Sequence, residues 1–305
     1  MTKTIGFDGR EHHFYVSPKA RLKANELKFP LSISLQVTRT CNLNCVYCSE
    51  VGDIPTPSLN TTKKMISNLI GVERIILTGG EPLMRDDLIE IAKHAKQSQF
   101  NIVSIATNAV LIKPEFAKDL ASFVDYVDVT IDGPRKIHNK IRGEYDAAMS
   151  GIRKLQDAQV AFSIVTVLFR ENVDSILHIC QIADVLGAKK LKILPPIVKG
   201  RGKNVLSKLL SPNELLDTFQ KIRLEKERNG WTPRITLTDW EKVGEGHALL
   251  VHPNGDVVAS PVPSEKDCIE VIGNILEEKI KSIWKRYSYK RNHLNKYIEK
   301  TLYVC

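Results

Sequence analysis

The chain has 305 residues, of which 43% are hydrophobic and 26% charged, with a formal net charge of +9. This composition excludes a disordered chain and predicts a globular protein with a sizeable core. The N-terminus has no apolar segment typical of a secretory signal, and no apolar run is long enough to span a membrane. We therefore expect a cytoplasmic protein, whose positive charge favours an acidic or phosphorylated partner.

Six short segments, most of them rich in β-branched residues, predict strands in chain order. They cover residues 31–38, 73–78, 101–106, 126–131, 161–169 and 190–195. Because these runs are almost continuously apolar, they are typical of parallel strands that are covered on both faces.

Segments with helical periodicity lie between and after these strands. They cover residues 59–71, 85–97, 145–158, 172–187 and 211–230, with Asn172 and Ser211 as candidate N-caps and Gly187 and Gly230 as stops. Consecutive strand–helix units predict an α/β fold whose parallel sheet is closed or partly closed into a barrel. An open doubly wound sheet is the alternative, but it would usually show a glycine-rich turn after the first strand.

The alternation of predicted strands and helices stops after Trp231. Residues 247–262 predict a hairpin that turns at Asn254-Gly255, and residues 272–287 predict a closing helix. We expect three parts: an N-terminal extension (1–30), a barrel (31–230) and a small α+β subdomain (231–305). The basic, tyrosine-rich run 281–300 could bind nucleic acid, but the charged face of an amphipathic helix explains it as well and is favoured.

Unusual residues follow the predicted strands at their carboxyl ends, where barrels of this class build their sites. Three cysteines, Cys41, Cys45 and Cys48, follow the first strand. "TGGEP" (78–82) follows the second, Asn108 the third, and "TIDGP" (130–134) ends the fourth.

The three cysteines predict a metal site. A reducing compartment disfavours disulfides, and structural zinc usually takes four ligands from two separated knuckles, of which only one is present. Three thiolates on one loop suit a cubane iron–sulfur cluster with one open iron. Cys180 is expected to be a buried apolar residue, and Cys268 and Cys305 lie far along the chain.

The glycines of "GGEP" let the backbone approach a ligand closely and adopt positive φ. Glu81 would then offer a carboxylate or a carbonyl near the cluster. An ordinary strand–helix turn is the plain alternative for Gly79, Gly80 and Glu81.

"CNLNCVYC" (41–48), "TGGEP" (78–82) and "TIDGPRKIHNKIR" (130–142) together resemble the radical S-adenosylmethionine (SAM) superfamily. The branch they resemble contains the GTP cyclases of molybdenum-cofactor synthesis and the SPASM/twitch-type peptide maturases. The resemblance covers roughly residues 31–230. It implies a partial (β/α)6 barrel, one [4Fe–4S] cluster on Cys41, Cys45 and Cys48, and SAM bound at the open iron.

The resemblance also implies roles for single residues near the cluster. Tyr47 would pack over the cluster and the adenine, and ordinary packing is its alternative. Gly79, Gly80 and Glu81 would contact the SAM amino group.

Residues after the later strands would bind the rest of SAM. Thr130 stands where the family has a ribose-binding serine, and Arg142, twelve residues on, would pair with the SAM carboxylate. Asn108 is a candidate contact to ribose or substrate, or a plain turn residue.

The implied reaction is reductive cleavage of SAM to a 5′-deoxyadenosyl radical, which abstracts hydrogen from a peptide or small polar substrate in natural-product or cofactor biosynthesis. The reductant would be of the flavodoxin or ferredoxin type. An enzyme that modifies a nucleotide or nucleic acid, and a non-enzymatic iron–sulfur protein, are the less favoured alternatives.

The chain departs from that branch after the barrel. No CxxC follows residue 48, so we expect no auxiliary cluster and a degenerate SPASM/twitch-like extension. Cys268 is a candidate hydrogen donor to the substrate radical.

Overall fold

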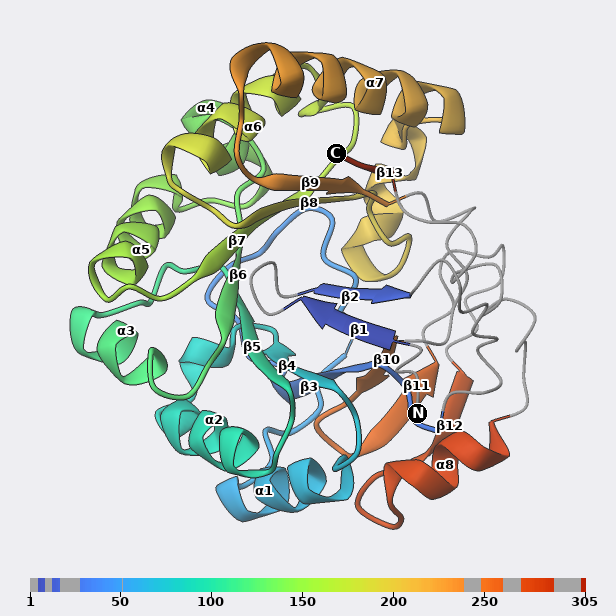
Figure 1. The fold of residues 1–305 in the computed structure, drawn as a ribbon. Coiled ribbons are helices and arrows are strands. Elements are labelled where there is room, and N and C mark those ends of the chain that lie inside the picture. The colour runs from blue at the N-terminus through green and yellow to red at the C-terminus, as the bar shows by residue number, and fades with distance from the viewer. Residues whose placement is uncertain are drawn as a thin grey trace.

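The computed structural model describes residues 5–8, 13–16, 28–50, 52–238, 248–259, 270–287 and 303–305. Among these residues one large sheet has the strand order β12-β11-β10-β3-β4-β5-β6-β7-β8-β9-β13 (Figure 1). A separate antiparallel hairpin pairs β1 (Ile5–Asp8) with β2 (His13–Val16). The predicted α/β class and partial barrel are confirmed.

The barrel wall is built from parallel strands. They are β3 (Ser32–Thr38), β4 (Arg74–Gly79), β5 (Ile102–Thr107), β6 (Tyr126–Thr130), β7 (Phe162–Val167), β8 (Lys190–Leu194) and β9 (Arg234–Leu237). All six predicted strands are present, and β9 adds another to the run. In β3 the fully buried Leu35 alternates with Gln36, which is also buried, so both faces of the strand are covered, as parallel strands require.

Helices cover the outer face of this curved sheet (Figure 1). They are α1 (Leu59–Asn68), α2 (Leu88–Gln97), α3 (Pro114–Leu120), α4 (Arg135–Ile141), α5 (Tyr145–Asp157), α6 (Ile176–Val185) and α7 (Pro212–Asn229). The 3-10 helices η2 (Pro82–Met84), η3 (Val173–Ser175) and η4 (Gly200–Lys208) lie in the connections that follow strands. In the part of the chain that the structure describes, no helix is both long and apolar enough to cross a bilayer.

The predicted helix ends are confirmed where local chemistry alone decides them. Ser211 caps α7 in a reciprocal capping box with Glu214, and Gly230 ends that helix with φ 66°. Asn172 stands at the N-cap position of η3, but its side chain makes no capping hydrogen bond. Its side chain instead donates to the carbonyls of Asp132 and Val167, both at 2.9 Å, because it is fully buried between the ends of β6 and β7.

The C-terminal hairpin continues the barrel sheet. β10 (Ala248–Val251) and β11 (Asp256–Ala259) form the predicted hairpin, and β10 pairs in parallel with β3. The helix expected over 272–287 is wrong in its first part, where β12 (Glu270–Asn274) pairs with β11. The Asn274 side chain donates to Asp256 Oδ1 at 3.0 Å and ties this strand to the hairpin.

The remainder of that segment is the amphipathic closing helix we expected. α8 (Ile280–Arg286) buries Ile280, Ile283 and Trp284 and exposes its basic residues. The following basic residues 288–300 lie outside the described part of the chain. At the opposite edge of the sheet, β13 (Tyr303–Val304) pairs with β9.

Helix α5 lies so close to the loop after β5 that a methyl group does not fit between them. A Cβ on Gly151 would lie 2.0 Å from the carbonyl oxygen of Ala109. Ala109 has φ 63° and directly follows the candidate site residue Asn108. The packing of α5 against Ala109 therefore supports the loop that carries Asn108.

We therefore predict that Gly151→Ala destabilises the protein by roughly 2 kcal/mol, since the helix or the loop must move. In an open helix the same change stabilises by up to about 1 kcal/mol. The measurement is urea unfolding followed by circular dichroism, with the neighbouring Ser150→Ala as the control. A stabilised Gly151→Ala variant would show that the contact is not tight.

Candidate functional site

The residues singled out after the strands gather around one cavity of about 1120 Å³. Its lining includes Cys41, Cys45, Tyr47, Cys48, Gly79, Gly80, Glu81, Asn108, Thr130 and Arg142. Every predicted site residue that the structure describes therefore lies at this cavity. Cys268, the candidate hydrogen donor, lies outside the described residues.

The three thiols belong to one segment, residues 41–48, here called the cysteine loop. Cys41 is exposed, Cys45 is buried and Cys48 is intermediate. Burial raises the pKa of Cys41 and of Cys45, and the neighbouring cysteines raise both further. A metal group that binds these sulfurs must therefore displace protons, which makes its uptake favourable at higher pH.

The geometry of the thiols differs from that of a site for one ion. Within the described residues, no group of three His, Cys, Asp or Glu side chains is arranged to hold a single metal ion. Tetrahedral zinc would bring its sulfurs to about 3.8 Å from one another, given Zn–S bonds of about 2.3 Å. A cubane spreads them, since each cysteine binds a different iron. Three thiols from one loop at one cavity are a donor set that suits such a cluster.

Gly79, the last residue of β4, and Gly80, which follows it, let that strand end pack against the chain that leads into Cys41. A Cβ on Gly79 would lie 2.2 Å from Thr38 O, and one on Gly80 would lie 2.4 Å from Thr40 O. Gly80 N donates to Thr38 O at 2.9 Å and Glu81 N donates to Thr40 O at 2.8 Å. The close approach expected for a ligand is thus made to the protein's own backbone, and contact with SAM stays a prediction.

Glu81 connects β4 to the corner after β5. Its carboxylate accepts hydrogen bonds from Thr107 Oγ1 at 2.7 Å, Asn108 N at 2.7 Å and Leu83 N at 3.1 Å. Burial raises the pKa of Glu81, against the opposing effect of these three donors. The Asn108 side chain then donates to Asn42 Oδ1 at 2.8 Å, so the chain of contacts ends on the cysteine loop.

Tyr47, Asp132 and Arg142 form a buried polar group beside the cavity. Tyr47 Oη donates to Asp132 Oδ2 at 2.5 Å, and Arg142 donates to Tyr47 Oη. Burial raises the pKa of Tyr47 and of Asp132. It would lower the pKa of Arg142, but the adjacent Tyr47 and Asp132 raise that pKa above its usual value and keep the guanidinium charged.

Arg142 retains hydrogen-bonding capacity. Its Nε is buried and has no partner among the described atoms, although buried donors are usually satisfied. Because Arg142 also lines the cavity, its charged guanidinium is a candidate partner for a carboxylate bound there. The Tyr47 hydroxyl, by contrast, already bonds to Asp132 and Arg142. The Tyr47 ring packs edge-on against Phe169, with 6.0 Å between the ring centroids.

His138 is a residue whose role the sequence did not reveal. Its Nδ1 accepts from Asp132 N at 3.2 Å, and its carbonyl oxygen accepts from Arg142 N at 2.7 Å. Burial, and then the Arg142 charge, lower the pKa of His138 to about 4. The neutral ring therefore binds the Asp132 backbone, while the His138 carbonyl binds the Arg142 backbone. The histidine within "TIDGPRKIHNKIR" was the available signal.

A family model described as the radical SAM superfamily matches residues 35–183 of the chain. With the cysteine loop and the strand-end motifs in one cavity, this match decides the assignment. Residues 35–183 of this chain form a radical SAM superfamily domain. Members of this superfamily use a [4Fe–4S] cluster and SAM.

Several known proteins are similar to this radical SAM chain. An AdoMet-dependent heme synthase of Methanosarcina barkeri is 34% identical over 184 residues, which are 57% of this chain and 52% of that protein. A probable GTP 3′,8-cyclase of Methanopyrus kandleri is 34% identical over 178 residues, 54% of this chain and 57% of that protein. The chain spans about half the length of the curated relatives it matches.

Among solved structures, Streptococcus suis SuiB bound to the precursor peptide SuiA superposes with a TM-score of 0.73 at 15% identity. The superposition covers 87% of this chain and 67% of that one. At this identity the likeness shows the fold, a partial barrel.

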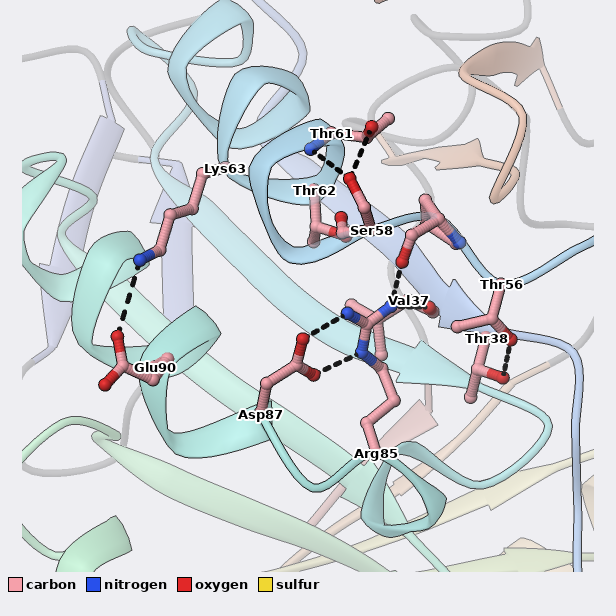
Figure 2. A network of polar contacts seen from close by, with 11 residues as sticks. Val37, Thr38, Thr56, Ser58, Thr61, Thr62, Lys63, Arg85, Asp87 and Glu90 are labelled. Atoms are coloured by element: carbon pink, nitrogen blue, oxygen red, sulfur yellow. Dashed lines mark hydrogen bonds and ion pairs between the residues drawn. The ribbon is translucent and has the colours of Figure 1, made fainter.

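Arg85 closes the base of the segment that carries the cysteine loop of this radical SAM chain. Figure 2 shows Arg85 reaching from the turn before α2 toward β3, with Asp87 beside it. Arg85 Nη1 donates to Val37 O at 2.9 Å and to Pro57 O at 2.7 Å, and its other nitrogens bind both Asp87 oxygens. Residues 37 and 57 flank the cysteine loop, so one buried guanidinium holds both ends.

A second contact acts at the same place. Thr38 and Thr56 are joined through their hydroxyl groups at 2.8 Å (Figure 2). The sequence showed Arg85 only as part of a helical segment. An arginine between two apolar residues and two aspartates, directly after "TGGEP", was the signal that could have found it.

We predict that Arg85→Met lowers the free energy of unfolding by roughly 3 kcal/mol at pH 7, because a buried charged partner is removed. The Arg85 hydrogen bond lowers the pKa of Asp87, so the stability from this pair is fully present above about pH 4, the pKa of an unfolded aspartate. It is lost as the pH falls through the lower folded value.

The measurement is urea unfolding of the wild type and Arg85→Met at pH 7 and at low pH. Lys93→Met, on the exposed part of α2, is the control. Two results would contradict the role of the pair. One is a difference in free energy of unfolding between wild type and Arg85→Met below about 0.5 kcal/mol at pH 7. The other is a difference that is as large at low pH as at pH 7.

Proposed function

We propose that this chain is a radical SAM enzyme that holds one [4Fe–4S] cluster on Cys41, Cys45 and Cys48 and binds SAM beside it. The observation that carries the proposal is a single cavity lined by three thiols, Glu81 and the charged Arg142. The alternative of a non-enzymatic iron–sulfur protein does not account for an unsatisfied arginine donor at the cavity wall.

In this proposal Arg142 pairs with the SAM carboxylate, using the donor that the protein leaves free. Gly79, Gly80 and Glu81 face the amino group. Thr130, at the end of β6, and Asn108, after β5, lie on the cavity lining and are proposed for the ribose or the substrate.

When bound, the reduced cluster and SAM supply a 5′-deoxyadenosyl radical that abstracts a hydrogen atom from the substrate. The protein's part is to bind, orient and exclude water. The cysteine loop is held at its base by Arg85 and at Asn42 by Asn108. These contacts fix where the sulfurs lie before any group binds, which lowers the cost of organising the site.

The substrate we favour is a small acidic molecule. Ligand cavities commonly measure about 300–1,000 Å³, so a cavity of about 1120 Å³ leaves room for a second molecule beside SAM. Arg39, Arg142 and Arg201 are part of its lining, which suits carboxylates or phosphates. The relatives' names include a heme synthase and a probable GTP cyclase, both consistent with an acidic substrate. A peptide is the second candidate, because SuiB was solved with its precursor peptide.

The proposal includes a reductant of the flavodoxin or ferredoxin type and a reducing, cytoplasmic location. Such a location keeps the thiols available for metal binding.

Anaerobic reconstitution tests the proposed enzyme. The protein should bind about four irons per chain, the content of one cubane, and should release 5′-deoxyadenosine when dithionite and SAM are added. Cys45→Ala should lose the brown chromophore and SAM cleavage together. Cys180→Ala is the matched control, since Cys180 is fully buried in the main core on α6. An intact cluster without nucleoside above background would reject the enzymatic proposal.

Replacing Arg142 tests the SAM site directly. We predict that Arg142→Lys weakens SAM binding about tenfold or more, because a lysine cannot make the paired contacts of a guanidinium. Isothermal titration of the reconstituted protein measures this, alongside iron content and thermal stability. Equal SAM affinity in the variant, with normal iron content, would assign the carboxylate to another residue.

A further inference from the structure

The cysteine loop has an outer side, away from the large cavity. A second cavity of about 360 Å³ lies there, lined by Asn44 and Val46 of the loop, by α4 and by η4. Asn44 and Arg201 line both cavities. The cysteine loop is therefore the thin wall between the proposed cluster site and this outer cavity.

The charged residues that line the outer cavity are mostly basic. Lys140, Arg201 and Lys208 contribute positive charge, and Glu171, which pairs with Lys208, contributes the single carboxylate of the lining. Lys140 is exposed, and Val46 is 36% exposed beside it. A positively charged rim with an apolar residue suits transient docking of an acidic protein.

Both walls of the outer cavity are bonded to the backbone next to the cluster ligands. Arg201 Nε donates to Cys45 O at 2.9 Å, and Gly202 N donates to Cys48 O at 3.2 Å. On the other wall, Val46 N donates to Ile141 O at 3.0 Å. A protein seated here would contact residues that bond directly to the backbone of Cys45 and Cys48.

We propose that this surface, formed by Val46, Lys140, Arg201, Asn204 and Lys208 and here called the outer patch, docks a small acidic one-electron carrier protein. The proposal rests on the proposed function, because it supplies the electron that the cluster needs. The carrier loses one electron and the cluster gains it; no bond forms or breaks and no proton moves. Encounters of this kind use small, electrostatically steered interfaces.

The test uses the full reconstituted chain and purified flavodoxin as the acidic probe. Binding is measured by biolayer interferometry at about 50 and 200 mM salt, and should weaken as salt screens the charges. Lys140→Glu and the double variant Lys140→Glu/Asn204→Glu should weaken binding by at least roughly threefold and tenfold, respectively. Lys93→Glu, an equal charge reversal on α2, should leave it unchanged.

A second measurement separates this proposal from the proposed function. 5′-Deoxyadenosine formation is followed with reduced flavodoxin and, in parallel, with dithionite, which needs no docking surface. Loss of the flavodoxin-driven rate in the Lys140 variants, with the dithionite-driven rate retained, supports the outer patch.

Two outcomes would overturn it: flavodoxin that binds the double variant as tightly as the wild type, or a flavodoxin-driven rate that the substitutions leave unchanged. Failure of the wild type with dithionite would instead reject the enzymatic proposal, and the salt-dependent binding would still report on the docking surface.

Discussion

The candidate site depends on the backbone contact between the end of β4 and the chain that leaves β3. Two hydrogen bonds, from Gly80 N and Glu81 N to Thr38 O and Thr40 O, fix the direction in which the chain enters the cysteine loop. Side chains at positions 79 and 80 would collide with that backbone. The carboxyl ends of β3 and β4 are thus bonded to each other and support the loop that carries the three thiols.

The other supports of the cysteine loop act on different points of the same segment. Arg85 holds the two flanks, Asn108 holds Asn42, and η4 and α4 bond to the backbone around Cys45. These contacts come from separate strand–helix units. The conformation of the cysteine loop therefore depends on how those units pack together in the barrel. Positioning of this kind is effective when sites must be organised to within fractions of an ångström.

Charge is distributed unevenly around the loop. On the cavity side Arg142 is buried with Asp132 and Tyr47 and retains an unsatisfied Nε. On the outer side the basic residues are accessible to solvent or lie at a cavity rim. The first arrangement suits a bound small anion, since low dielectric strengthens each contact. The second suits a protein that arrives and leaves, since screened surface charges steer association without holding it.

The sequence by itself determined six barrel strands, the helix ends at Ser211 and Gly230, and a group of residues after the strands that lie together at the cavity. Apolar periodicity, capping chemistry and the position of a residue directly after a strand are local properties, so they can be read from neighbouring letters. Only the tertiary structure decided the partners of those residues. It turned Asn172 from a helix cap into a link between β6 and β7, placed β12 where a helix was expected, and gave Arg85 and His138 their roles. The physical reason is that hydrogen bonds between residues distant in the sequence exist only once the parallel strands have aligned, and no local pattern records which donor will meet which acceptor.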